Sequence, residues 1–110
     1  MNYNVKTIPD FDKEAKRIAK KHKSIKYDIS DLIDNLEVNP TLGIHLGQNV
    51  YKIRMAISDT NKGKSGGARI ITYVLLDDET VFLADIYLKS EHDTVDVNRV
   101  ILRLKDAGII

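Results

Sequence analysis

Apolar and polar residues alternate along some stretches of this chain and recur at helical spacing along others. Residues 2–7 alternate, which predicts a short strand. Two stretches with apolar residues three and four positions apart follow, and we expect amphipathic helices there, with Asp10 and Ser24 as N-caps. The short connection between them predicts an antiparallel helical hairpin that ends at Asn39-Pro40. The apolar positions are Phe11, Ala15, Ile18, Ala19 and His22 in the first helix, and Ile25, Ile29, Leu32, Ile33 and Leu36 in the second.

Runs of β-branched and aromatic residues follow the turn-rich segment NPTLGIHLGQN. Residues 50–57, 68–76 and 80–88 each predict a strand, and the DDE turn pairs the last two as a hairpin. Residues 96–109 have a weaker helical pattern. The element order predicts an α+β fold, with a mainly antiparallel sheet of about four strands and the helical hairpin packed on one face. No repeat or low-complexity segment divides the chain, so residues 1–110 are expected to form a single domain.

The segment NKGKSGGAR contains the Gly-Lys-Ser sequence with which nucleotide-binding P-loops end. A P-loop needs a glycine five positions before that sequence and a helix after it, so that backbone N–H groups surround the phosphates. In this chain Ser58 stands at the first position, and a predicted strand follows. The segment is therefore predicted to be a basic hairpin connection, in which Gly66 and Gly67 supply positive φ angles.

Composition excludes several classes of site. The chain has no cysteine, which excludes disulfides, thiolate nucleophiles and Cys-based zinc sites. Its three histidines lack metal-ligand spacing, so we expect neither a metal nor another cofactor. Of these, His22 is expected to pack against the core, whereas His45 has no identifiable partner. No signal peptide or membrane-spanning run is recognisable, which predicts a cytoplasmic protein with no membrane partner.

The net charge of +1 is unevenly distributed along the chain. Segregated charges of this kind are most often solvated helix faces, so they support a nucleic-acid function only together with other observations. Basic residues gather in KEAKRIAKKHKSIK and between Lys52 and Arg69, and acidic residues gather in DLIDNLE, DDET and SEHDTVD.

The strand periodicity groups the remaining polar residues on one sheet face. Residues two apart on a strand share a face, so Tyr51, Ile53, Met55 and Ile57 can line the core while Lys52 and Arg54 point the opposite way. In the last strand, Phe82, Ala84, Ile86 and Leu88 are predicted to share the apolar side. The opposite face would span roughly two nucleotides of a single nucleic-acid strand. It collects Lys52, Arg54, Arg69, Tyr73, Tyr87 and Lys89.

Three motifs carry a resemblance to a known family. They are the KIR of VYKIRMAI, the Gly/Lys loop that ends in GGAR, and IYLKSE at the end of the last strand. Together they resemble the RelE/ParE superfamily of bacterial toxins, most closely its HigB-like branch, over essentially the whole chain. The resemblance implies a RelE-like fold and the toxin of a type II toxin-antitoxin system, which cleaves mRNA on the ribosome without metal. It also implies a cognate antitoxin, expected to be a small helix-turn-helix protein.

The resemblance further implies site residues. RNA supplies its own nucleophile, the 2′-OH, so the protein must help to remove that proton, stabilise the phosphorane and protonate the departing 5′-oxygen, which gives a 2′,3′-cyclic phosphate. Clustered cations stabilise the phosphorane and make one of their number easier to deprotonate. Lys52 is therefore the candidate base, Arg54 and Arg69 would bind the phosphate, and Lys89 would add a further phosphate contact.

The identity of the general acid stays open. Several members of the superfamily carry a Tyr or His in the C-terminal segment, and DTVDVNRVILRLKDAGII has neither. His92 and Tyr87 are the nearest substitutes, and Tyr73 or Tyr87 could stack on a base. Lys62 and Lys64 in the loop are expected to contact phosphates, with His92 as a further substrate-binding residue.

Two alternative functions remain. ParE-like members of the same superfamily poison DNA gyrase, a protein target, without cleaving RNA. An inactive relative would act only by binding the antitoxin. The basic and aromatic patch favours the nuclease, because ParE-like members generally lack it.

Overall fold

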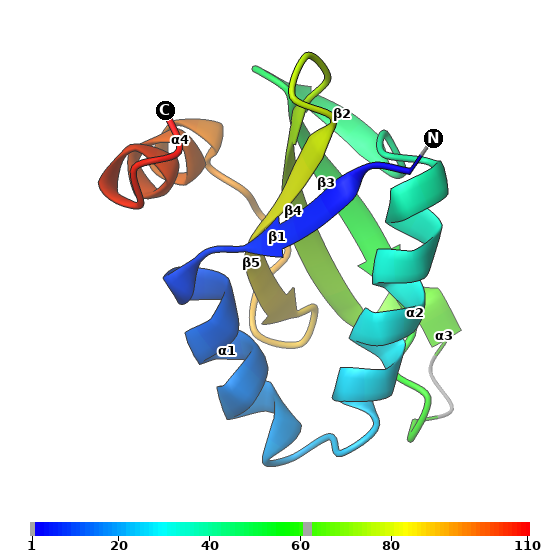
Figure 1. The fold of residues 1–110 in the computed structure, drawn as a ribbon. Coiled ribbons are helices and arrows are strands. Elements are labelled where there is room, and N and C mark those ends of the chain that lie inside the picture. The colour runs from blue at the N-terminus through cyan, green and yellow to red at the C-terminus, as the bar shows by residue number, and fades with distance from the viewer. Residues whose placement is uncertain (1, 61–62) are drawn as a thin grey trace.

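The computed structural model describes residues 2–60 and 63–110, and the side chains at positions 64 and 65 lie outside this description. In the described part, a five-stranded sheet carries α1 and α2 on one face, and α4 lies on the side away from α2 (Figure 1). The strands are β1 (Asn4–Thr7), β2 (Ile44–Gly47), β3 (Val50–Met55), β4 (Ala68–Leu75) and β5 (Thr80–Leu88). The helices are α1 (Pro9–Ala19), α2 (Ile25–Val38), the single turn α3 (Gly63–Gly66) and α4 (Val97–Asp106).

The sheet order is β1-β5-β4-β3-β2. β1 pairs with β5 in parallel, and the β2–β3, β3–β4 and β4–β5 pairings are antiparallel, which confirms the predicted α+β class and the mainly antiparallel sheet. The expected four strands become five, because residues 44–47 of the turn-rich segment pair with β3. A four-residue strand interrupted by a register shift between His45 and Gly47 is too short to show clear alternation. His45 also has a partner, since its ring stacks on Tyr51.

The helical hairpin packs its apolar side on the sheet, as predicted. Phe11 and Ile18 of α1 and Leu36 of α2 are almost fully buried, and each such side chain contributes about 1.5–3 kcal/mol relative to an exposed position. The N-cap of α1 is Ile8 rather than Asp10, because Pro9 occupies the first helical position, where its fixed φ and missing N–H are tolerated. Ser24 is the N-cap residue of α2 as predicted, although its side chain makes no capping hydrogen bond.

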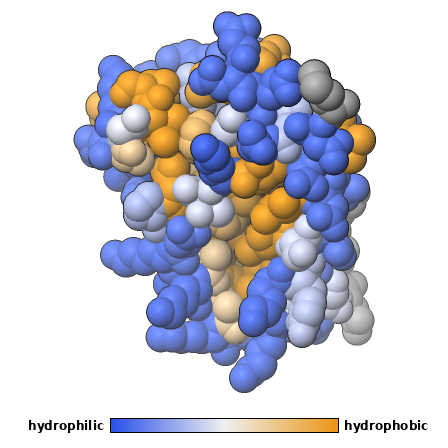
Figure 2. Space-filling model, in the orientation of Figure 1, coloured by the Kyte–Doolittle hydropathy of each residue, from blue (hydrophilic) through white to orange (hydrophobic). Residues whose placement is uncertain are grey.

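The basic residues of the hairpin lie on its solvent side. Figure 2 shows an apolar strip between two hydrophilic flanks in the orientation in which α1 and α2 face the viewer. The lysines between residues 13 and 26 are exposed. The first basic cluster of the sequence is thus a solvated helix surface.

A β-bulge in β5 changes which side chains share a face. The register with β4 skips Ala84. On one side of the bulge Phe82 lies opposite Tyr73, and on the other side Tyr87 lies opposite Arg69. Because opposite residues point to the same face, Phe82 belongs with Arg69 and Tyr87. The predicted alternation, which grouped Phe82 with the helix-facing residues, is wrong at this point.

The terminal helix α4 covers part of the face that the sequence left open. Tyr73 and Phe82 are buried in the same apolar cluster as Val100 and Leu104 of α4. Asp96 caps this helix by accepting hydrogen bonds from two backbone N–H groups of its first turn. The basic residues therefore occupy only the part of this face that α4 leaves uncovered.

The glycine-rich connection between β3 and β4 differs from the expected loop. Its described part forms the single turn α3, and the positive φ of 64° belongs to Gly63 rather than to Gly66 or Gly67. Gly67 is required for another reason, because a Cβ there would collide with the backbone carbonyl of Met55. In the part of the chain that the structure describes, no helix is long and apolar enough to cross a membrane.

Candidate nucleic-acid interface

Three neighbouring strands place Arg54, Arg69 and Tyr87 in one row. The register pairs Arg69 with Arg54 of β3 on one side and with Tyr87 of β5 on the other. Opposite residues have Cβ atoms about 5 Å apart on a common face. Lys52 precedes Arg54 by two positions on β3, so it lies on the same face. Lys89 is the first residue after β5, and its charge acts on Asp93 together with those of Lys52 and Arg69. The structure brings together these five residues from the sequence analysis.

The basic residues of this row differ in their exposure. Arg54 and Lys89 are exposed and Lys52 is half-buried, whereas Arg69 is only 1% exposed. The Arg69 Nη1 donates to the carbonyl oxygen of Ala68 at 3.2 Å, and its Nε donates to Oδ1 of Asp93 at 3.2 Å. Arg69 is thus held in a fixed orientation inside the protein.

Asp93 is a site residue that the sequence analysis missed. Besides Arg69, it contacts Lys52, whose Nζ lies 3.7 Å from the same Oδ1. Burial alone would raise the pKa of Asp93, but the charges of Lys52, Arg69 and Lys89 prevail and lower it. The carboxylate is therefore ionised at neutral pH. In the sequence Asp93 is one of several acids in SEHDTVD, and nothing in that pattern distinguishes it from a solvated residue.

The two candidates for the general acid lie against each other. The rings of Tyr87 and His92 stack with centroids 4.0 Å apart and an angle of 20° between their planes. Tyr87 is 4% exposed, and its hydroxyl has no hydrogen-bond partner among the described residues. Burial raises the pKa of Tyr87, and the charge of Asp93 raises it further, while Arg69 lowers it. The phenol therefore keeps its proton at neutral pH.

The structure separates one predicted residue from the interface and leaves two undescribed. Tyr73 shares the face but is 7% exposed in the core, so its ring presents no open surface to a nucleic-acid base. Lys62 lies outside the described residues. Only the backbone of Lys64 is described, within α3.

The described residues contain no group of three His, Asp or Glu side chains placed to hold a metal ion. The Nδ1 of His22 lies 3.1 Å from the Oδ1 of Asp59, a residue of the loop that follows β3. His22 was expected to pack against the core; it is half-buried and also makes this polar contact. The nearby Asp28 is buried and accepts hydrogen bonds from Ser24 and Ser58. These contacts fasten the start of the glycine-rich connection to α2.

Carboxylates satisfy the open edge of β5 beside the interface. The register of β1 with β5 covers residues 80–83. Farther along β5, the N–H of Ile86 donates to the side chain of Asp85 at 2.9 Å. The N–H of Leu88 donates to Glu91 at 3.3 Å. Because unpaired edge groups attract other chains, these side-chain bonds protect the edge.

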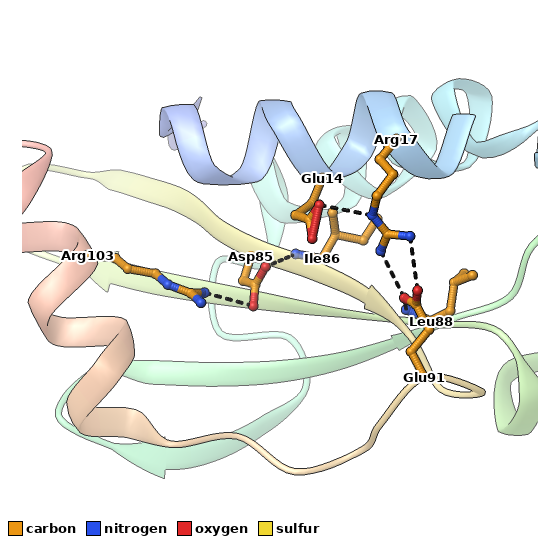
Figure 3. A network of polar contacts seen from close by, with 7 residues as sticks. All are labelled: Glu14, Arg17, Asp85, Ile86, Leu88, Glu91 and Arg103. Carbon is orange, nitrogen blue, oxygen red and sulfur yellow. Dashed lines mark hydrogen bonds and ion pairs between the residues drawn. The ribbon is translucent and has the colours of Figure 1, made fainter. Parts of the chain in front are cut away.

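Two arginines hold these carboxylates in place, as Figure 3 shows. Arg103 of α4 donates to Asp85 at 3.0 Å. Arg17 of α1 makes two bonds of 2.9 Å to Glu91. A groove of about 730 Å³ runs between these elements along β5. The loop that carries His92 and Asp93 is thereby fastened to α1.

Two solved structures share this architecture. A double arginine-to-alanine mutant of the E. coli toxin RelE in the free state matches with a TM-score of 0.60 and 13% identity, over 96% of this chain and 97% of that chain. A crystal structure of the isolated E. coli RelE toxin matches with a TM-score of 0.52 and 14% identity, over 92% and 96%. No family model and no curated protein sequence matches the chain. The predicted RelE-like fold is confirmed: over nearly its full length, this chain has the fold of the RelE toxin.

Proposed function

We propose that the chain is the toxin of a type II toxin-antitoxin system and cleaves mRNA on the ribosome. The observation that carries this proposal is the row of Arg54, Arg69 and Tyr87 on one face of a RelE-like sheet, with Lys52 on the same face and Lys89 directly after β5. In the proposed reaction, the 2′-OH of the RNA attacks the neighbouring phosphodiester. Cations on this face can stabilise the negative charge that develops, and a protonated phenol can donate the proton that the leaving oxygen needs.

Each side chain has a role in the proposed reaction. Lys52 removes the proton from the 2′-OH as that oxygen attacks the phosphorus. Arg54 and Arg69 bind the non-bridging oxygens, where a guanidinium can make two parallel hydrogen bonds, and Lys89 adds a further charge. Tyr87 protonates the departing 5′-oxygen, and its raised pKa means that the phenol still carries this proton at neutral pH. The products are a 2′,3′-cyclic phosphate and a free 5′-hydroxyl, and no metal takes part.

The proposed partners follow from the same surface. The ribosome would hold the mRNA in position, which supplies orientation that this small interface cannot provide alone. An antitoxin with an acidic segment could cover Arg54 and Lys89, which are exposed. The protein would act in the cytoplasm, where it meets translating ribosomes.

Single-turnover cleavage on programmed ribosomes tests the proposal. The wild-type chain should cut ribosome-bound mRNA, leave a 2′,3′-cyclic phosphate and remain active when added metal is chelated, provided that the ribosomes stay intact. Arg54→Ala should slow the reaction by about 10²-fold, the cost of removing one preorganised donor. Lys26→Ala, on the exposed surface of the hairpin, is the matched control and should cleave at the wild-type rate.

The rival functions give different results when the chain is expressed in bacteria and the synthesis of protein and DNA is followed. A gyrase poison would stop DNA replication and induce DNA damage before protein synthesis fell. An antitoxin-binding relative would do neither. Absence of cleavage on ribosomes, together with either of these outcomes, would overturn the nuclease proposal.

A further inference from the structure

Three consecutive residues after β5 each contact a different part of the fold. We refer to residues 91–93 as the strap. Glu91 pairs with Arg17 of α1, His92 stacks on Tyr87 of β5, and Asp93 contacts Arg69 of β4 and Lys52 of β3.

The strap lies over the buried part of the interface. Arg69 is 1% exposed and Tyr87 is 4% exposed. In contrast, His92 is exposed, and 35% of the Asp93 side chain is exposed. The strap therefore separates Arg69 and Tyr87 from solvent, and both are residues that the proposed reaction needs in contact with RNA.

The contacts of Asp93 resemble those of a bound phosphate. One carboxylate oxygen faces the Nε of Arg69 and the Nζ of Lys52 at 3.2 Å and 3.7 Å. A non-bridging phosphate oxygen takes the same kind of donors. Because Asp93 is ionised, the protein already supplies an anion where the RNA phosphate would have to bind.

Charge balance explains why an internal anion is placed there. Lys52, Arg54 and Arg69 share this face, and the charge of Lys89 acts on the same carboxylate as those of Lys52 and Arg69. Buried or crowded like charges destabilise a fold unless they are compensated. A second acid on the face, Asp85, is bound to Arg103 of α4. Asp93 contacts Lys52 and Arg69 and so compensates their charges.

We propose that Asp93 is an internal substitute for the RNA phosphate, and that the strap must move off Lys52 and Arg69 before a phosphate can bind them. The identity of the phosphate ligand rests on the proposed function. The competition between carboxylate and phosphate does not, because it requires no cleavage.

The proposal predicts opposite effects of Asp93→Asn on stability and on binding. The change keeps the size of the side chain and removes its charge, so the uncompensated cations should lower the melting temperature. The same cations become available, so phosphate affinity should rise about tenfold or more, as expected when a competing closed state is removed. If Asp93 only supported the fold, the variant would lose both stability and affinity.

The experiment measures binding by fluorescence anisotropy and competition. The probes are a short single-stranded 2′-O-methyl RNA, whose methylated 2′-oxygen cannot attack the phosphorus, and inorganic tripolyphosphate. Asp85→Asn is the matched control, because Asp85 lies on the same face and pairs with an arginine but does not contact Lys52 or Arg69. Glu91→Gln is a second test, since it releases the strap from α1 without changing the cation site.

Tighter binding of both probes by Asp93→Asn, a smaller gain for Glu91→Gln and no gain for Asp85→Asn would support the proposal. Equal or weaker binding by a folded Asp93→Asn variant would overturn it. If Asp93→Asn does not fold, Glu91→Gln decides by the same criterion. A gain that is confined to tripolyphosphate, with no RNA binding by any variant, would support the strap while contradicting the nuclease function.

Discussion

Arg54 lies directly opposite Arg69 across the β3–β4 pairing, so two guanidinium groups arise from adjacent positions on one sheet face. Like charges at opposite positions of antiparallel strands destabilise the pairing. The arrangement becomes favourable once an anion lies between or beside the two groups. In the free chain Asp93 provides that anion for Arg69, and in the proposed complex a phosphate would do so for both arginines.

Replacing Arg69 should affect both catalysis and stability. Arg69→Ala should lower the single-turnover cleavage rate by on the order of 10²-fold or more, since it removes a preorganised donor. Arg69→Lys should restore little, because an ammonium cannot reproduce the two-pronged guanidinium contact. Arg69 is also buried, so Arg69→Ala should reduce the free energy of unfolding by about 1–3 kcal/mol.

Exposed Arg54 provides the control that separates these two effects. Arg54→Ala should slow cleavage with a much smaller loss of stability, because its side chain is already in solvent. Saturating Arg69→Ala with programmed ribosomes gives the decisive rate. A wild-type rate at saturation would mean that Arg69 only binds RNA.

Lys62 and Lys64 should act through phosphate contacts rather than through the chemical step. Their alanine variants should weaken association with RNA or ribosomes, and each lost phosphate contact should reduce the salt dependence of binding by about one unit of slope. The cleavage rate at saturation should change little. Lys105→Ala, at an exposed position of α4, is the control. A large fall in the saturated rate would place these lysines in the reaction itself.

Tyr87 should ionise later than an ordinary tyrosine when pH is raised. Its burial keeps the folded-state pKa above the ordinary value of 10.0. The associated stability is therefore present below pH 10 and is lost as pH rises through the folded-state pKa. Ultraviolet absorption should show a late titration step that Tyr87→Phe removes and that Tyr27→Phe, at a 71% exposed position, leaves in place. Persistence of this step in Tyr87→Phe would contradict the assignment.

The pair of Arg17 and Glu91 should make stability sensitive to acid. Hydrogen bonds from Arg17 lower the pKa of Glu91 below its ordinary value of 4.5, with burial acting in the opposite direction. This contribution is present above pH 4.5 and is lost as pH falls through the lower folded-state pKa. It should be at most about 1 kcal/mol, because the pair is exposed and screened by solvent.

A double-mutant cycle measures the interaction of this pair. Arg17→Gln, Glu91→Gln and the double variant should be unfolded with denaturant at pH 7 and at pH 3. A coupling energy that is favourable at pH 7 and weaker at pH 3 is the expected result. Equal coupling at both values would show that the contact does not depend on the charge of Glu91.

Local patterns in the sequence determined most of the secondary structure. The spacing of Phe11, Ile18 and Leu36 predicted the helical hairpin because an amphipathic helix can bury only one side. Runs of β-branched residues predicted β3, β4 and β5, because such side chains favour strands. The KIR, GGAR and IYLKSE motifs indicated the fold that the solved structures share. The two-residue period of a strand placed Lys52 and Arg54 on one face. The prediction that Arg69 of the next strand shares that face also needed the pairing of the two strands, which the structure supplies.

Tertiary structure decided what the sequence pattern could not. One skipped residue at Ala84 moved Phe82 to the opposite face, because a bulge reverses the alternation that a linear pattern assumes. Tyr73 became part of the buried core, and a loop 24 positions after Arg69 brought Asp93 onto its guanidinium. These outcomes depend on which distant segments meet in space. The spacing of apolar residues indicates only which residues face the core. A charged residue such as Asp93 looks the same in the sequence whether it is solvated or binds a buried cation.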